Sequence, residues 1–178
     1  MSVLKIEPAT VAVAPAIVAL MERAYRGSES LKGWTNEAHL IDGPRTSLAE
    51  ITACINDPDT QILVAIDGDG RLLGCAAIAL EGSQCSFGKF AVDPHSQGLG
   101  IGKRLLDAAE AAARHTFGVS QMTMTVVDGR AELEAFYERR GYRRSGKQVC
   151  MRDLISGQPM TKGQDLMLNE YVKALPSV

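Results

Sequence analysis

The sequence has little excess charge of either sign. Its 178 residues carry a formal net charge of −2, and the pI is near 5.9. Domains that bind nucleic acids usually display a strongly basic face. We therefore expect no nucleic-acid partner.

The sequence is also poor in cysteine clusters. No Cys-x-x-Cys pair occurs, and no histidine stands at a metal-ligand spacing from any of the four cysteines, Cys54, Cys75, Cys85 and Cys150. A structural zinc site would need such clusters. We expect no bound metal, and we interpret the cysteines as small buried side chains in a reducing compartment.

No hydrophobic run is long enough to cross a membrane. The apolar stretch over residues 11–21 falls well short of the roughly 20 residues that a spanning helix needs. Charged residues flank it, and no convincing signal-peptidase site follows. It predicts a core-facing helix, and we expect a cytoplasmic protein without a membrane partner.

The composition that remains suits one globular domain over residues 1–178. Hydrophobic residues make up 46% and charged residues 22% of the chain. Sequence periodicity predicts strands at 3–6, 60–66, 71–81, 85–92, 121–127, from 142 onward and at 165–175, with helices at 10–25, 48–56, 102–115 and about 133–140. Hairpin neighbours in the middle and strand–helix–strand crossovers later predict a mixed α/β sheet flanked by helices.

The stretch "VDPHSQGLGIGKRLL", residues 92–106, carries three glycines between a predicted strand and a predicted helix. A P-loop would need Gly where Gln97 stands and Ser or Thr where Arg104 stands. A dinucleotide-binding fingerprint would need its third glycine where Lys103 or Leu105 stands. Both nucleotide patterns are therefore excluded.

The glycine run still favours an anion site. Glycines expose backbone N–H groups, and a helix N-terminus attracts negative charge. Lys103 and Arg104 add positive charge nearby. The stretch predicts a cradle for a phosphate or pyrophosphate, and a simple strand-to-helix turn is the alternative.

Two motifs together resemble one family. Gln97, Gly100 and Gly102 fill the positions of Q/R-x-x-G-x-G/A, the acetyl-CoA signature of the GNAT superfamily of N-acetyltransferases. The segment "LEAFYERRGYRRSG", residues 133–146, is similar to the family's later Φ-Tyr-Glu-x-x-Gly-Tyr/Phe segment. The resemblance covers residues 60–146. It implies a mostly antiparallel mixed sheet that is splayed at the cofactor site.

The resemblance implies an N-acetyltransferase that moves an acetyl group from acetyl-CoA directly to an amine of a small molecule, an amino acid or a protein. Tyr137 matches the tyrosine that protonates the leaving thiolate. The backbone of one strand would bind the pantetheine arm, and the loop would bind the pyrophosphate. The residues implied are Phe90, Ala91 and Val92 for the arm, and Gln97, Gly98, Leu99, Gly100, Ile101, Gly102 and Lys103 for the pyrophosphate.

Two assignments stay open at this point. Glu81 lies near the expected opening of the sheet and is a candidate general base, but it is equally a solvated turn carboxylate, and water is the default proton carrier. Arg130 occupies a position where many family members have an asparagine that contacts pantetheine. Arg130 could bind the coenzyme in its place, cap the start of the following helix poorly, or be solvated.

The resemblance also implies that the acceptor site lies between the first two predicted helices. Trp34 and Glu37 would suit a cationic amine, and Arg45 would suit a carboxylate on the acceptor. Trp34 is alternatively an anchor for a long loop. A non-catalytic acyl-CoA-binding sensor on the same fold is the alternative function, and the strand over residues 166–173 could pair two chains into a homodimer.

Overall fold

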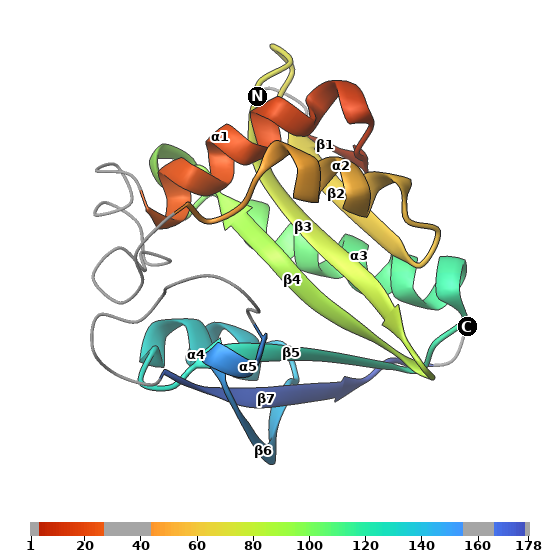
Figure 1. Cartoon of the computed structure of the whole chain (residues 1–178), viewed down its shortest axis with the longest axis vertical. Helices are drawn as coiled ribbons and strands as arrows, with labels where there is room; N and C mark the ends of the chain where they lie inside the picture. Colours follow the sequence, from red (N-terminus) through yellow and green to blue (C-terminus); the bar gives the residue numbers. More distant parts are fainter. Residues whose placement is uncertain (1–3, 27–43, 155–165, 177–178) are drawn as a thin grey trace.

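The computed structural model describes residues 4–26, 44–154 and 166–176. Within these residues, seven strands form one mixed sheet in the order β1-β2-β3-β4-β5-β7-β6 (Figure 1). The strands are β1 (Lys5–Pro8), β2 (Thr60–Ile66), β3 (Leu72–Glu81), β4 (Gln84–Val92), β5 (Gln121–Val127), β6 (Arg143–Cys150) and β7 (Met167–Ala174). The helices are α1 (Ala14–Tyr25), α2 (Leu48–Asn56), α3 (Ile101–Phe117), α4 (Ala131–Glu138) and α5 (Met151–Leu154). The predicted mixed sheet with flanking helices is confirmed.

The middle of the chain follows the predicted pattern closely. β2, β3 and β4 pair antiparallel, as the predicted meander requires. α2 starts behind Ser47, whose hydroxyl accepts a hydrogen bond from the Glu50 backbone N–H at 3.2 Å. β1 begins two residues later than predicted, and the short helix α5 was not predicted.

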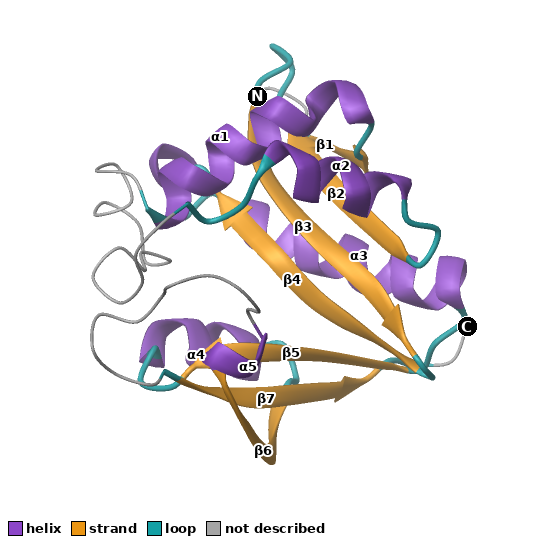
Figure 2. Cartoon of the chain, viewed as in Figure 1, coloured by secondary structure: helices purple, strands orange, loops and turns teal. Residues whose placement is uncertain are grey.

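Helices cover both faces of the sheet (Figure 2). α1 and α2 lie on one face, and α3 packs against β2, β3 and β4 on the other. Along β3, Cys75 and Ala77 join the core beneath α1, while Ala76 and Ile78 join the core beneath α3. Burial on both faces explains why the β3 sequence is continuously apolar rather than alternating.

The sheet is held together weakly at its centre. β4 and β5 are parallel and pair at only two positions, Cys85 with Met122 and Ser86 with Thr123. Beyond them the strands diverge, so the second half of β4 has a ladder partner on the β3 side alone (Figure 1). The predicted splay is therefore present, and it opens toward the carboxyl ends of both strands.

On the face of the sheet that α3 covers, a charged cluster links this helix to the strands beyond the opening. Lys173 of β7 places its Nζ 2.8 Å from both carboxylate oxygens of Glu110 on α3. The Tyr142 hydroxyl donates to the same carboxylate at 2.9 Å. The Lys173 and Glu110 side chains are only 22% and 14% exposed, so water screens this pair less than a surface pair.

The suggestion that the last strand pairs two chains is wrong. β7 lies between β5 and β6 and forms ladders with both, so neither of its edges is available to a second chain. β6 is the strand at this edge of the sheet. No helix among the described residues is long and apolar enough to cross a membrane.

We expect Lys173→Met to lower the free energy of unfolding by about 2 kcal/mol, because Glu110 would lose two charge-assisted hydrogen bonds in a half-buried place. Lys147→Met is the matched control, since Lys147 is 65% exposed and lies 3.6 Å from Glu170. That change should stay within about 0.5 kcal/mol. Equal losses in urea unfolding would contradict a bracing role for Lys173.

Candidate active site

A β-bulge interrupts β4 where the sheet opens. β4 pairs with β3 at Gly88 and again at Ala91, and the two residues between them, Lys89 and Phe90, face the single residue Ala76. Lys89 has a φ of 46°, a left-handed conformation that is uncommon for a residue with a side chain. Bulges of this kind bend a strand and redirect its backbone groups.

Side chains from the α1–α2 face hold this bulge. The Tyr25 hydroxyl at the end of α1 donates to the Phe90 carbonyl, and the Cys75 thiol donates to the Lys89 carbonyl at 3.4 Å. The Lys89 ammonium pairs with Glu50 of α2. Burial raises the pKa of Glu50, but the bonds from Lys89 and from a neighbouring threonine outweigh it and leave the pKa below its ordinary value.

The backbone beyond the bulge faces alternately toward β3 and toward the opening. The Asp93 N–H donates to the Leu73 carbonyl at 2.8 Å, so Asp93 and Ala91 both face β3. Val92 therefore faces the opening, where its carbonyl accepts a bond from the Gln97 side-chain amide at 3.3 Å. Of the strand residues predicted to bind pantetheine, Ala91 has its backbone turned away.

The three glycines after β4 serve two different needs. Gly98 and Gly100 have φ values of 85° and 77°, and a Cβ added there would meet nothing within 4 Å. These positions need glycine for the left-handed backbone, and Gly100 is the N-cap of α3. Gly102 has no such φ, but its Cβ would lie 3.0 Å from Cζ of Phe90. It lets α3 approach the aromatic core closely.

A cavity of about 210 Å³ lies against this loop and the start of α3. Its lining includes the predicted residues Phe90, Val92, Gln97, Gly98, Gly100, Ile101, Gly102 and Lys103, and also Phe136 and Arg140, which were not predicted. Leu99 is 72% exposed and does not line it. The Arg104 guanidinium donates to the Leu4 carbonyl at 2.8 Å and so is occupied elsewhere.

A second cavity, of about 230 Å³, lies in the opening between β4 and β5. Phe90 lines both cavities, so the two adjoin at this residue. Tyr137, Arg130 and Arg45 all line the second cavity. The Arg45 guanidinium lies over the Tyr25 ring, 4.8 Å from its centre.

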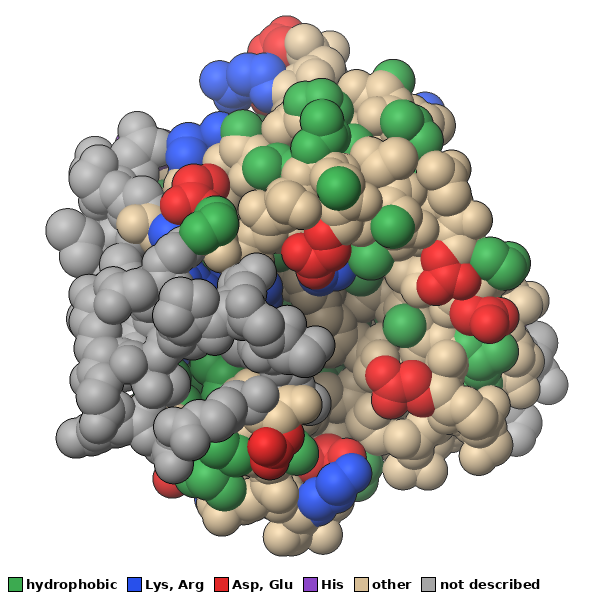
Figure 3. All heavy atoms as spheres, viewed as in Figure 1, with side chains coloured by type: hydrophobic (Ala, Val, Ile, Leu, Met, Phe, Trp, Pro, Cys, Tyr) green, Lys and Arg blue, Asp and Glu red, His purple; other side chains and the backbone are tan. Residues whose placement is uncertain are grey.

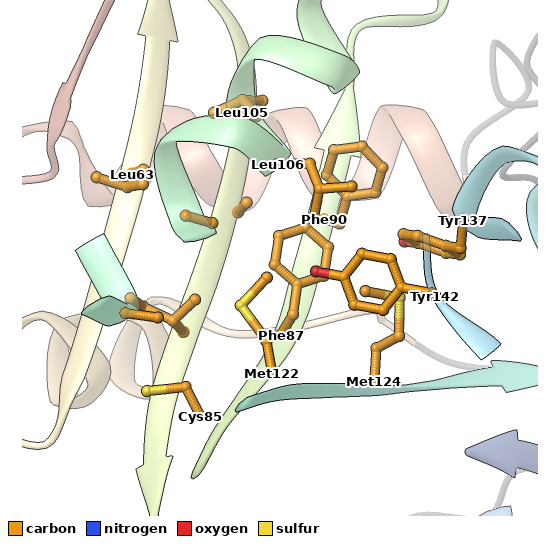
Figure 4. Packing of buried hydrophobic residues seen from close by; sticks show 14 of the residues in the cluster. Leu63, Cys85, Phe87, Phe90, Leu105, Leu106, Met122, Met124, Tyr137 and Tyr142 are labelled. Atoms are coloured by element: carbon orange, nitrogen blue, oxygen red, sulfur yellow. The ribbon is translucent and has the colours of Figure 1, made fainter. Parts of the chain in front are cut away.

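Tyr137 is fixed by aromatic contacts. Its side chain is 4% exposed, and its ring lies 5.2 Å from Phe136, 5.9 Å from Tyr142, 6.3 Å from Phe87 and 6.4 Å from Phe90, centre to centre. Figure 4 shows the rings of Phe87, Phe90, Tyr137 and Tyr142 close together. Such packing holds the phenol in one orientation at the cavity wall.

The Tyr137 hydroxyl keeps its proton at neutral pH. Burial, and then the nearby Tyr25, raise its pKa well above the ordinary value for tyrosine, and Arg140 offsets this only in part. Among the described residues, no hydrogen-bond partner of this hydroxyl occurs. The group can therefore donate a proton to a ligand atom in the cavity.

Glu81 does not line the cavity that holds Tyr137. It is the exposed last residue of β3 and lines a third cavity of about 370 Å³, together with Cys54 and Glu170. This hollow lies on the α1–α2 face between the two halves of the sheet (Figure 3). Trp34 and Glu37 lie outside the described residues.

A family model described as an acetyltransferase (GNAT) domain matches residues 41–163, which is more than half of the chain. The chain belongs to this GNAT family. A comparison with curated protein sequences gives no match. The GNAT resemblance that was based on residues 97–102 and 133–146 is thus confirmed at the level of the family.

Solved structures agree with the GNAT fold. A GNAT-family acetyltransferase from Staphylococcus aureus superposes with a TM-score of 0.68 at 16% identity, covering 98% of this chain and 100% of its own. The ribosomal-protein-S18-alanine N-acetyltransferase from Escherichia coli gives 0.71 at 15% identity, covering 99% and 96%. A variant of the spermidine N-acetyltransferase from Vibrio cholerae gives 0.70 at 14% identity, covering 97% and 94%. At these identities the likeness shows the fold alone.

Sequence reasoning missed two polar residues that line these cavities. Tyr25 belongs to an apolar helix, and nothing in its spacing indicates that its hydroxyl reaches the β4 bulge. Arg140 stands inside the segment over residues 133–146, where only Tyr137 was given a role. A cationic residue three positions after the tyrosine was a signal that could have been used.

We expect Gly100→Ala to cost about 1–2 kcal/mol of stability, because an alanine pays for a left-handed conformation. Gly88→Ala is the control, since Gly88 has an ordinary φ and its Cβ would meet nothing within 4 Å. The control should change stability by less than about 1 kcal/mol. Chemical denaturation of both variants measures the difference, and a neutral Gly100→Ala would refute the conformational explanation.

Proposed function

We propose that this GNAT domain is an acetyl-CoA-dependent N-acetyltransferase that acts in the cytoplasm and transfers the acetyl group directly to an amine. The observation that carries the proposal is that Phe90 lines both cavities, which therefore adjoin. A coenzyme whose pyrophosphate lies against the glycine loop would pass Phe90 and Val92, and its thioester end would reach Tyr137. The four free cysteines support a reducing compartment.

The chain's backbone would hold most of the donor. The loop N–H groups between Gln97 and Lys103, together with the N-terminus of α3, suit a pyrophosphate. The opening beside β4 suits the pantetheine arm, which would add to the sheet as an extended chain does in β-augmentation. We propose Val92 and Phe90 as the backbone contacts, because Ala91 faces β3. Arg130, at the N-cap of α4, would lie beside the arm.

The reaction then needs one proton to leave the amine and one to reach the sulfur. The neutral amine attacks the thioester carbon, a C–N bond forms, and the C–S bond breaks to release the thiolate of coenzyme A. Tyr137 would give its proton to this sulfur, and its raised pKa keeps that proton in place before the reaction. The phenolate would regain a proton from water.

Water is a better candidate than Glu81 for removing the amine proton. Glu81 is exposed and lines a neighbouring hollow rather than the cavity of Tyr137. The two cavities share lining residues on β4 and β5, including Lys89 and Thr125, so solvent in the hollow would adjoin the reaction site. The proton that the amine releases would pass to this solvent.

The acceptor would enter from the α1–α2 side, where Arg45 lines the cavity. We propose Trp34, Glu37 and Arg45 as acceptor-binding residues. Acetyltransferases of this fold act on acceptors as different as a ribosomal-protein alanine and spermidine, by their names. A small-molecule amine, an amino acid and a protein amine are therefore all to be tried.

The direct test mixes acetyl-CoA with a panel of these amines and follows free thiol. The thiols of Cys75 and Cys85 should interfere little, since burial raises their pKa to about 12 and about 11. Thiol release that depends on one class of amine would support the proposal. Binding of coenzyme A without turnover on any amine would instead indicate the acyl-CoA-binding sensor.

We expect Tyr137→Phe to lower kcat about 100-fold or more, since it removes the proton donor, while the Kd for coenzyme A stays nearly the same. Tyr142→Phe is the control: its hydroxyl bonds to Glu110, and the residue does not line the Tyr137 cavity. It should keep turnover at temperatures where it is folded. An unchanged kcat for Tyr137→Phe would remove the assignment.

The pH profile should rise without a falling limb from Tyr137. A raised pKa means that the phenol stays protonated to higher pH than a free tyrosine, beyond about pH 10. The neutral fraction of the amine grows over the same range. We expect kcat/KM to increase from pH 7 to pH 9.5, and a decline there that disappears in Tyr137→Phe would contradict the raised pKa of this phenol.

A further inference from the structure

One side chain that lines the cavity beside the glycine loop comes from a distant segment, directly after α4. Arg140 follows α4 and lines the same cavity as Gly98, Gly100 and Lys103. Its guanidinium carbon lies 3.6 Å from the centre of the Phe136 ring. Its Nη1 donates to the Phe136 carbonyl at 2.8 Å. These contacts fix the orientation of the guanidinium plane.

Arg140 differs from the other cation of this cavity. Lys103 is paired with Asp107 at 2.7 Å, and both side chains are more than half exposed. In the described part of the chain, Arg140 has no carboxylate within ion-pair distance, and its buried Nε–H has no hydrogen-bond partner. Loss of solvent, and then the neighbouring Arg139, lower the pKa of Arg140.

A partly desolvated guanidinium without a carboxylate partner is stabilised by an anion that completes its hydrogen bonds. The fork of a guanidinium matches phosphate oxygens, and such charge-assisted bonds are among the stronger ones in proteins. The glycine loop lines the same cavity, and the backbone N–H groups of such a loop at a helix N-terminus suit an anion. An anion in this cavity would be bound by the loop and by Arg140 together.

We propose that Arg140 binds the pyrophosphate of coenzyme A together with the glycine loop. This inference rests on the proposed function, because it takes coenzyme A as the ligand. The loop follows β4 in the chain, and Arg140 follows α4, which comes after β5. A pyrophosphate held by both would join the two halves across the opening.

The test measures the Kd of coenzyme A by titration calorimetry for wild type, Arg140→Met and Arg139→Met. Methionine keeps an apolar stem over Phe136 while it removes the guanidinium. Arg139 is the matched control, because it is the adjacent exposed arginine and does not line the cavity. We expect a loss of about 10- to 100-fold for Arg140→Met and less than about 3-fold for Arg139→Met.

Truncated ligands locate the contact. Dephospho-coenzyme A, which lacks only the 3′-phosphate, should lose the same factor as coenzyme A. Pantetheine, which has no phosphate and is measured by competition, should bind wild type and Arg140→Met equally. If Arg140→Met folds poorly, Arg140→Lys replaces it and should lose less than the methionine variant would, since it keeps the charge without the fork.

Several results would overturn the inference. They are an unchanged Kd for Arg140→Met, an equal loss for Arg139→Met, an equal loss for pantetheine, or a loss that vanishes with dephospho-coenzyme A. The last would move Arg140 to the 3′-phosphate. Failure of wild type to bind coenzyme A would instead reject the proposed function, so the two failures are distinct.

Discussion

The two-position pairing of β4 with β5 is the constraint on which the rest of the structure depends. Hydrogen bonds join these strands at Cys85 and Ser86 alone, and beyond that point β4 runs on with only β3 beside it. An unpaired strand edge within a sheet would ordinarily form hydrogen bonds with another strand. Here the bulge at Lys89 and Phe90 bends β4 away from β5. Aromatic side chains, rather than another strand, pack beside the opening.

A sheet that opens in this way needs support from outside its ladders. On one face, Tyr25 and the Lys89–Glu50 pair fasten the bulge to α1 and α2. On the other, Lys173 binds Glu110 and ties β7 to α3. The opening is thus a fixed feature of the fold, and the polar groups around it are positioned before any ligand arrives. This pre-organisation is what a site for an extended donor requires.

Much of the fold was predictable because local signals were strong. Ser47 with Glu50 marked the start of α2, and the period of β2, β3 and β4 was clear. The bulge was not predictable, since it depends on which residue of β4 pairs with Ala76. Tyr25 reaches the opening through tertiary packing, and its spacing in the sequence carries no such information. For Arg140, only its place three residues after Tyr137 was a signal. Glu81 was placed near the opening by its position in the chain, and its cavity is a different one.

The proposed function requires above all that the acetyl-CoA donor lies in the opening between β4 and β5. A crystal structure of the protein with coenzyme A tests this directly. We expect the pantetheine arm beside Phe90 and Val92, the pyrophosphate against the loop of Gly98 and Gly100, and the sulfur within reach of the Tyr137 hydroxyl. Coenzyme bound elsewhere, with the opening filled by protein side chains, would contradict it.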